Sequence, residues 1–169
     1  MKPSEFVAIN YPYAKKVEDS KGIHWAAIIA QYALETGWGR SIKGNNFAGI
    51  KATKDTPKEK KQLLRTKEEL GSPNLKYLFT KVYSVNLLPN GNYLYDVDDW
   101  FMKYESPEKA FADYADFFYR NSRYKKALEV KRDPFKFVEE IHKAGYATAS
   151  NYSTILKQII NTVLKYEPK

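Results

Sequence analysis

A single carboxylate, Glu35, closes the most apolar segment of the chain, residues 23–35, and a glycine-rich turn follows it. A helix that is apolar on almost every face is a buried one, so we expect Glu35 in the last turn of a buried helix. The helix dipole and the apolar neighbours Leu34 and Trp38 both disfavour the charged carboxylate there and raise its pKa. A carboxyl group that keeps its proton near neutral pH suits the general acid of glycosidic bond cleavage. The alternative is an exposed residue at a fraying helix end, paired with Arg40.

Other residue types that carry chemistry are scarce. The chain has no cysteine, which excludes disulfides and thiolate metal sites. His24 and His142 are the only histidines, and neither belongs to a ligand motif. We therefore expect no metal and no cofactor, and we assign both histidines structural roles at helix ends.

The formal net charge of +8 favours polyanionic surroundings such as nucleic acid, anionic lipid headgroups or the teichoic acids of a bacterial wall. The basic residues are spread along the chain, and the dense run at residues 58–61 contains an acid and has the composition of a solvated loop. Without a clustered basic face or a nucleic-acid motif, we expect no nucleic-acid partner. No stretch reaches the roughly 18 apolar residues of a membrane helix, so we expect no membrane insertion.

The elements that must position Glu35 suggest a single α+β domain over residues 1–169. Two short helices are expected at 4–10 and 13–20, because Pro12 disfavours helix in the residue before it. The strand-like runs at 81–88 and 92–97 flank Asn90-Gly91, a strong hairpin signal within a β lobe over about 52–105. Helices return after Ser106-Pro107 and Asp133-Pro134, which pair a capping side chain with a first-turn proline, and a last helix begins near Asn151.

Several separated motifs resemble the bacterial and phage peptidoglycan hydrolases of glycoside hydrolase family 73, which include the glucosaminidase domain of flagellar muramidase-like proteins. The matching stretches, in chain order, are IAQYALETGWGRS, NNFAGIKA, FMKYESPEKAFADYADFF, RYKKAL and AGYATASNYSTIL. Together they cover about residues 5–165. The sequence departs from the family pattern at Ala48 and at Ala149-Ser150, which affects local substrate contacts and leaves Glu35 untouched.

The resemblance implies a lysozyme-like α+β fold, a mainly helical lobe with a small inserted β-hairpin lobe and a substrate groove between them. It implies endo-β-N-acetylglucosaminidase activity that cuts the β-1,4 bond after N-acetylglucosamine in the wall glycan. Glu35 matches the catalytic acid of the family. Glu68 in RTKEEL falls where the second carboxylate occurs, with Glu69 beside it, and Tyr146 matches a tyrosine kept beside the acid. A solvated strand end for the two acids and a half-buried core position for Tyr146 are the alternatives.

Substrate contacts are expected from side chains that stack on sugar rings or read hydroxyl and acetamido groups. These residues are Trp38, Asn46, Phe47, Tyr104 and Glu69, with Phe101 as a further aromatic. For each aromatic the alternative is packing in the core.

The stereochemical course stays open between inversion, with Glu68 as base, and assistance by the 2-acetamido group of the substrate. A muramidase or lytic transglycosylase of the same fold, and a non-catalytic glycan-binding module, are the competing interpretations. The expected partners are glycan strands of peptidoglycan and possible anionic wall polymers, bound by a monomer. The N-terminal residues lack a signal peptide pattern, so we expect an enzyme that reaches the wall after release, as a phage lysis or virion enzyme would.

Overall fold

A computed structural model describes residues 1–169, and the chain divides into two compact units. The helical unit comprises residues 1–48 and 104–169, and the β unit comprises residues 49–103. The mixed α+β class expected from the sequence is confirmed. No helix is long and apolar enough to cross a membrane.

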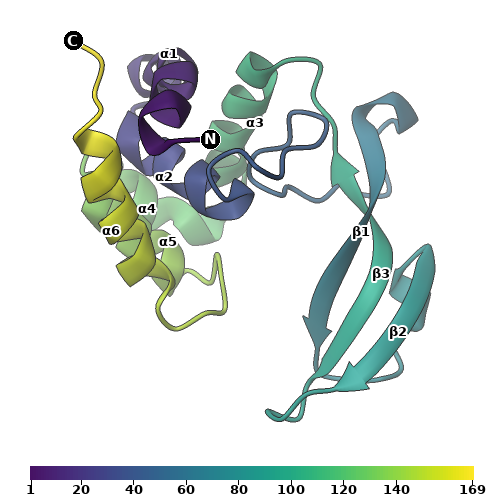
Figure 1. The fold of residues 1–169 in the computed structure, drawn as a ribbon. Coiled ribbons are helices and arrows are strands. Elements are labelled where there is room, and N and C mark those ends of the chain that lie inside the picture. The colour runs from purple at the N-terminus through teal and green to yellow at the C-terminus, as the bar shows by residue number, and fades with distance from the viewer. The chain divides into compact units, whose positions relative to one another are not determined.

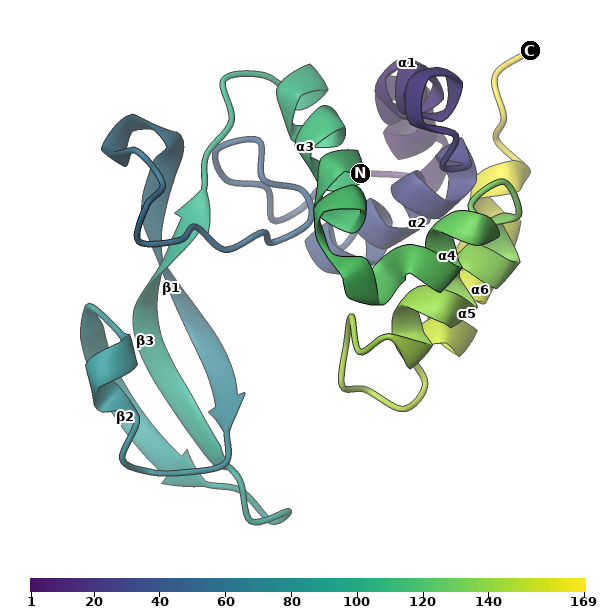
Figure 2. The same cartoon turned by 180° about the vertical axis from the view of Figure 1, so that it is seen from behind.

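Six α-helices build the helical unit (Figure 1). They are α1 (Pro3–Lys21), α2 (Trp25–Thr36), α3 (Pro107–Arg120), α4 (Lys125–Glu129), α5 (Pro134–Lys143) and α6 (Tyr152–Leu164). The helix α2 packs against α1, α5 and α6, and α3 packs against α1 and α4 (Figures 1 and 2). The first and last thirds of the chain therefore build one helical body.

The core of this unit is dense in aromatic rings. Tyr32 on α2 meets Phe111 and Tyr114 of α3 edge to face, at centroid distances of 4.5 and 5.1 Å. Phe118 contacts Phe137 of α5 in the same way, at 5.2 Å. Each such pair adds about 0.5–1.5 kcal/mol beyond the burial of its area. These rings surround the helix that carries Glu35 and fix its position.

The expected break at Tyr11-Pro12 is wrong, because α1 runs through Pro12 as one helix. The buried residues of α1 lie on both sides of the proline and include Phe6, Val7 and Val17. Tyr11 also packs its ring on Trp25 of α2, at 4.9 Å. Burial of one continuous face outweighs the hydrogen bond that proline removes.

The helix starts expected from capping signals are confirmed. The side chain of Ser106 accepts a hydrogen bond from the backbone of Lys109, and Asp133 accepts two at the start of α5. His24 caps α2 by accepting a hydrogen bond from the backbone of Ala26 at 3.1 Å. Each cap satisfies a backbone N–H group that the first turn of a helix leaves without a partner.

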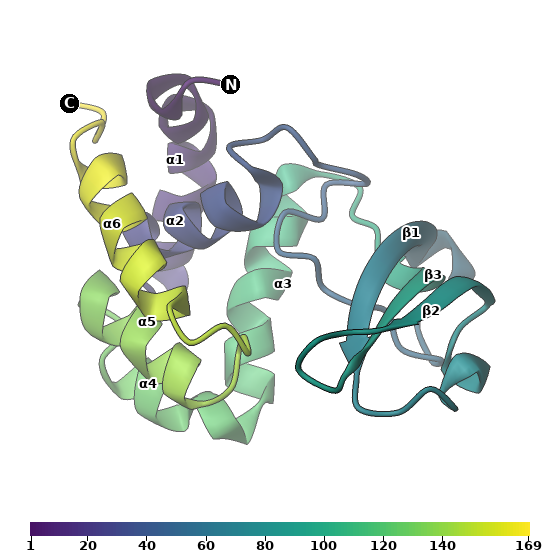
Figure 3. The same cartoon turned by 60° about the horizontal axis from the view of Figure 1, so that its bottom comes forward.

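The β unit is a three-stranded antiparallel sheet in the order β1-β3-β2, with β3 in the centre (Figure 3). Its strands are β1 (Lys61–Leu70), β2 (Lys81–Leu87) and β3 (Tyr93–Met102). The hairpin expected around Asn90-Gly91 joins β2 to β3 and is confirmed, with Gly91 at a φ of 86°. The strand β1 was outside the sequence-based expectation, apart from a strand end at Glu68.

The centre of the sheet is held by Tyr95 and Val97, both fully buried. The hydroxyl of Tyr95 donates to the carbonyl of Ser72 at 2.6 Å and accepts from the backbone of Leu75 at 3.1 Å. One tyrosine thus ties the connection between β1 and β2 to the middle strand. This clamp organises a unit that has little core of its own.

The chain enters and leaves the β unit side by side. Met102 donates its backbone N–H to Ile50 at 2.9 Å, and Ala52 donates to Trp100 at 3.0 Å. Within the helical unit, the backbone of Tyr104 donates to Gly44 at 2.8 Å. Backbone hydrogen bonds therefore join the two connecting segments, both within the β unit and within the helical unit.

Candidate active site

Glu35 lies in the last turn of α2, as the sequence predicts. Its carboxyl reaches solvent, yet surrounding protein atoms desolvate it and raise its pKa above the ordinary glutamate value. Glu35 is exposed, as the alternative expects, but the pair with Arg40 is not formed, because the Arg40 side chain donates to the carbonyl of Gly37 at 2.9 Å. The structure therefore holds a carboxyl group without a cation, in surroundings that favour its neutral form.

A backbone turn fixes the end of α2 directly after Glu35. Gly37 adopts a left-handed φ of 56°, and Trp38 follows with a φ of 59°. A left-handed conformation is unusual for a bulky residue and marks a site where the surroundings enforce the backbone. The N–H of Trp38 donates to Ala33 at 2.8 Å, and its ring packs edge-on against Phe6 at 5.7 Å. Packing thus maintains the strained turn beside the acid.

A buried network of phenols lies on the side of α2 that carries Glu35. Gln31, one turn before Glu35, is fully buried, accepts a hydrogen bond from the hydroxyl of Tyr114 and donates to that of Tyr152 at 3.0 Å. Burial raises the pKa of both phenols, and the charge of Glu35 adds to this. These tyrosines stay neutral, so they offer hydroxyl dipoles and no charge to stabilise the carboxylate.

Tyr146 belongs to the same neighbourhood. Its ring stacks on Phe118 at 5.8 Å and on Tyr152 at 5.9 Å. Burial raises the pKa of Tyr146, and the charges of Tyr152 and Glu35 contribute in turn. The half-buried ring of Tyr146 thus occupies the core position named as the alternative, and its role beside Glu35 stays a prediction.

The remaining candidates in the helical unit are mostly occupied by packing. Phe47 is 6% exposed and stacks on Tyr32 at 5.1 Å, which favours the core role over sugar stacking. Tyr104 is also buried, and its hydroxyl donates to Asp113 at 2.6 Å. Asn46 is buried in the turn after α2, and Trp38 is half-buried. Of these four side chains, Trp38 leaves the most surface for a ligand.

Glu68 lies on β1 in a cluster of charges within the β unit. Lys51 bridges two carboxylates there, at 2.8 Å from Glu68 Oε1 and 2.9 Å from Asp99 Oδ2. Partial burial acts to lower the pKa of Lys51, but its hydrogen bonds to the two acids outweigh this and raise it. The lysine therefore stays charged and holds the Glu68 carboxylate in one orientation.

Glu69 points to the other face of β1, because successive side chains alternate along a strand. One of its oxygens accepts hydrogen bonds from the side chains of Asn92 and Asn90, both at 2.8 Å. These bonds lower the pKa of Glu69. Glu69 thus connects β1 to the turn between β2 and β3. Glu68 lies on the opposite face of the strand and has different partners.

Sequence reasoning assigned no role to Lys51, Asp99, Gln31 or Tyr152. Gln31 had a usable signal, since it is the main polar interruption in an otherwise apolar helix. Lys51 lies in the quoted stretch NNFAGIKA, but its two acidic partners are far along the chain. Phe101, named as a further aromatic, lies under the Lys51 ammonium at 6.0 Å from the ring centroid.

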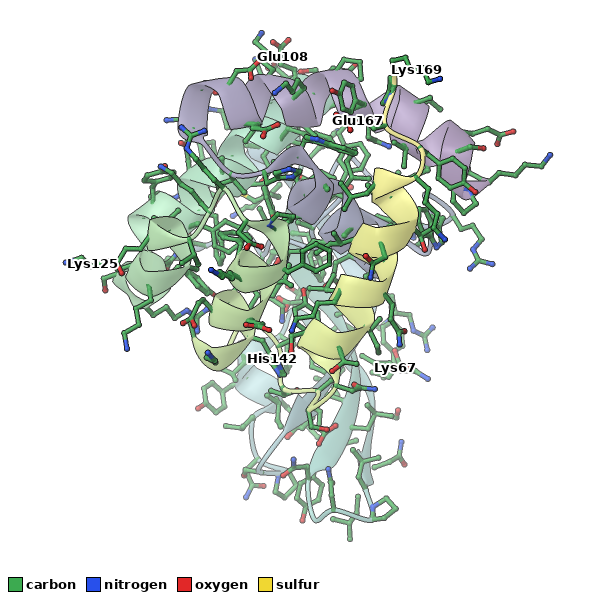
Figure 4. The ribbon with its side chains drawn as sticks, turned by 90° about the vertical axis from the view of Figure 1, so that its left-hand side faces the viewer. Lys67, Glu108, Lys125, His142, Glu167 and Lys169 are labelled. Atoms are coloured by element: carbon green, nitrogen blue, oxygen red, sulfur yellow. The ribbon has the colours of Figure 1, made fainter.

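The two histidines take structural positions. His24 caps α2, and burial lowers its pKa. His142 lies at the end of α5 facing α6, where its Nδ1 is 3.0 Å from the Ser153 hydroxyl (Figure 4). Both side chains serve helix ends and helix contacts, and the His142 ring also packs edge-on against Tyr152 at 5.8 Å.

A glutamate that favours its neutral form at the end of a buried helix, in an α+β fold, is an arrangement that suits a glycoside hydrolase. The model of the glucosaminidase family, described as mannosyl-glycoprotein endo-beta-N-acetylglucosaminidase, matches residues 11–165. The chain belongs to this family, and the family expected from its motifs is confirmed.

The chain is similar to named relatives over nearly its whole length. It is 31% identical over 170 residues to the peptidoglycan hydrolase FlgJ of Pseudomonas aeruginosa, covering 96% of this chain and 37% of that protein. The chain thus spans well under half of that relative. The structure of a peptidoglycan hydrolase mutant from Sphingomonas sp. A1 aligns with a TM-score of 0.72 at 27% identity, covering 96% of this chain and 97% of that one. The glycoside hydrolase domain of Salmonella typhimurium FlgJ shares the fold, with a TM-score of 0.68 at 24% identity over 98% and 90% of the two chains.

Proposed function

We propose that the chain is a peptidoglycan hydrolase that acts as an endo-β-N-acetylglucosaminidase. The proposed reaction cleaves the β-1,4 bond after N-acetylglucosamine in the glycan strand. Membership of the glucosaminidase family supports the reaction type, and similarity to FlgJ of Pseudomonas aeruginosa, a peptidoglycan hydrolase, supports the substrate.

One observation carries this proposal, the state of Glu35. Its pKa is raised by desolvation, and no cation pairs with it to reverse that effect. A general acid must hold its proton at the working pH and then release it to a leaving group. Desolvation shifts Glu35 toward the first condition, and its access to solvent serves the second.

In the proposed mechanism Glu35 protonates the glycosidic oxygen as the bond to the N-acetylglucosamine C1 breaks. The neutral phenols of Tyr146 and Tyr152 offer dipoles to the glutamate as it becomes charged. Two routes then complete hydrolysis. In one, Glu68 removes a proton from the attacking water and the configuration inverts; in the other, the substrate acetamido oxygen attacks C1 and water later opens the ring.

The test is mass spectrometry of purified peptidoglycan after digestion by the wild-type chain and by Glu35→Gln. Borohydride reduction labels the newly formed reducing ends. We expect reduced N-acetylglucosamine ends with the wild type and none with the variant. The isosteric amide keeps the shape of the side chain and removes only the transferable proton.

Other outcomes would reassign the chain. Reduced muramic acid ends would identify a muramidase, and anhydro ends a lytic transglycosylase. Binding to the glycan without cleavage by either protein would favour a binding module. Glu167→Gln changes an exposed acid of the C-terminal tail and serves as the matched control, which should cleave like the wild type.

The expected route to the wall, through phage lysis or a virion, stays a prediction. Lysis of living cells by externally added protein would measure the bacteriolytic activity that this route requires. A gene located in a bacterial chromosome beside an export system would contradict it.

A further inference from the structure

One segment of the helical unit concentrates positive charge. Residues 120–136 contain seven basic residues and two acidic ones, a formal net charge of +5 against +8 for the whole chain. The basic residues are Arg120, Arg123, Lys125, Lys126, Lys131, Arg132 and Lys136. The segment covers the end of α3, the short helix α4 and the start of α5 (Figure 2). We call it the α4–α5 basic surface.

Most of these cations are exposed and without an ion-pair partner. All except Lys131 are exposed, and only Arg120 forms an ion pair, with Asp113. Lys125 projects from the side of the helical unit into solvent (Figure 4). Of the two acids, Asp133 is engaged as the cap of α5. The positive charge of this surface is therefore available to bind an anionic partner.

The surface also contains a hollow. A shallow open depression of about 270 Å³ lies among residues 129–133 and Lys136. The ammonium of Lys131, on its rim, donates to the hydroxyl of Tyr119 at 2.8 Å. One cation is thus held by a hydrogen bond beside several exposed ones on a shallow surface, an arrangement that accommodates an extended chain better than a shaped small molecule.

Several basic residues of the β unit, unlike those of the α4–α5 basic surface, interact with acidic or aromatic residues of their own unit. Lys51 bridges two acids, Arg65 pairs with Asp96 at 2.8 Å, and Lys61 lies over the ring of Trp100. Arg65 also covers the ring of Tyr83, at 4.0 Å from its centroid. The positive charges of these residues are therefore paired largely within the β unit.

We propose that the α4–α5 basic surface binds a linear phosphodiester polymer of the bacterial wall, such as a poly(glycerol phosphate) chain. The choice of a wall polymer rests on the proposed function, whereas the preference for a polyanion rests on the charges alone. Spaced, exposed ammonium and guanidinium groups match a flexible chain of single negative charges. Each phosphate contact releases a counterion, so binding weakens as salt rises.

Two other polyanionic surfaces fit less well. Membrane binding needs large apolar side chains beside the cations, and no exposed large hydrophobic residue falls within 120–136. Single-stranded nucleic acids bind to exposed aromatic rings on which bases stack. In this segment Tyr124 is buried and Phe135 is half-buried, and the exposed ring of the neighbouring Tyr119 lies under the ammonium groups of Lys21 and Lys131. The surface offers charge without either feature.

The test measures binding of purified poly(glycerol phosphate) to the full chain at increasing salt. The surface variant combines Lys125→Gln, Lys126→Gln, Arg132→Gln and Lys136→Gln. The control variant combines Lys54→Gln, Lys58→Gln, Lys60→Gln and Lys67→Gln, which removes the same charge from exposed positions of the β unit. We expect the surface variant to lose about tenfold or more in affinity at low salt and to show a shallower salt dependence, while the control keeps its affinity.

Equal losses in the two variants would show that only net charge matters and would overturn the proposal. Tighter binding to a DNA duplex than to the polymer at the same salt would overturn it in favour of nucleic acid. Hydrolysis of polymer-free sacculi is measured in parallel, and both variants should retain it. Loss of polymer binding and loss of hydrolysis are thus separate results, and thermal melting checks that each variant is folded.

Discussion

The two units hold their candidate carboxylates in opposite ways. In the helical unit, Glu35 has no cationic partner and lies beside neutral phenols in a densely aromatic body. In the β unit, Glu68 is bound by Lys51, and Glu69 accepts two amide hydrogen bonds. The pKa of Glu35 is thus raised and that of Glu69 lowered, while Glu68 is held by an ion pair.

This difference agrees with the roles proposed for the two carboxylates. A desolvated carboxyl group without a partner is disposed to carry a proton, whereas one bound by a charged lysine is disposed to act as an oriented anion. The inverting route uses one of each, whereas the acetamido-assisted route does not require the second carboxylate as a base. An active Glu35→Gln variant would contradict this difference between the units. Different effects of substituting Glu68 and Glu69 would support it.

The largest effect is expected from Glu35→Gln. Removal of the general acid should reduce turnover of peptidoglycan by about 10²–10⁴-fold, with little change in glycan binding. Release of soluble muropeptides measures the rate, and sedimentation with sacculi measures the binding. Activity within a few-fold of the wild type would dismiss Glu35 as the acid.

The second comparison places Glu68→Gln beside Glu69→Gln, adjacent residues on opposite faces of β1. We expect a loss of about 10²-fold in turnover for Glu68. A change within about twofold is expected for Glu69, because its hydrogen bonds only tie the strand to a nearby turn. The muropeptide assay applies again, and the reverse ranking would transfer the second role to Glu69.

A smaller effect is expected from Lys51, through the orientation of Glu68. Lys51→Met should reduce turnover by about tenfold, because Glu68 and Asp99 then lose their shared cation and repel each other. Lys51→Arg keeps a cation with several donors and should recover most of the rate. The pH–rate profile separates positioning from folding, since a merely structural role would leave the shape of the profile unchanged. Equal losses in both variants would argue against the positioning role.

The smallest effect concerns pH and Glu35. Because the folded state raises the pKa of Glu35, the folded chain binds its proton more tightly than the unfolded chain, and stability from this group falls as pH rises through the carboxyl range. Glu35→Gln should therefore melt at a slightly higher temperature than the wild type at pH 7. The difference should vanish below about pH 4, where both states are protonated. The alkaline limb of kcat/KM should likewise lie above the ordinary carboxyl range, and a limb within that range would contradict the shift.

Much of the fold was predictable where the signal is local. The capping residues Ser106 and Asp133 each precede a proline, and Asn90-Gly91 lies between two strand-like runs, so neighbouring residues alone determine these elements. The apolar run that forms α2 is equally self-contained. Two predictions failed or fell short because distant contacts decide them. Packing on α2 carries α1 through Pro12, and pairing with β3 makes the charged β1 a strand.

The candidate site also has features that local sequence predicts and features that depend on distant contacts. The place of Glu35 at the end of a buried helix follows from residues 23–39 alone. The bond between Gln31 and Tyr152 joins residues 121 positions apart, and the pair of Lys51 with Asp99 also depends on tertiary structure. Such partners affect the protonation and orientation of side chains in the site, yet no local sequence pattern predicts them.

The two connecting segments of the β unit have a consequence for how such a chain can be built. Residues 50–52 and 100–102 are joined by backbone hydrogen bonds, and Tyr104 returns to the loop at Gly44 within the helical unit. Insertions whose ends lie together can be gained, exchanged or lengthened without rethreading the host. Residues 49–103 therefore form a segment with adjacent ends, whose length can change while the connections within the helical unit stay the same.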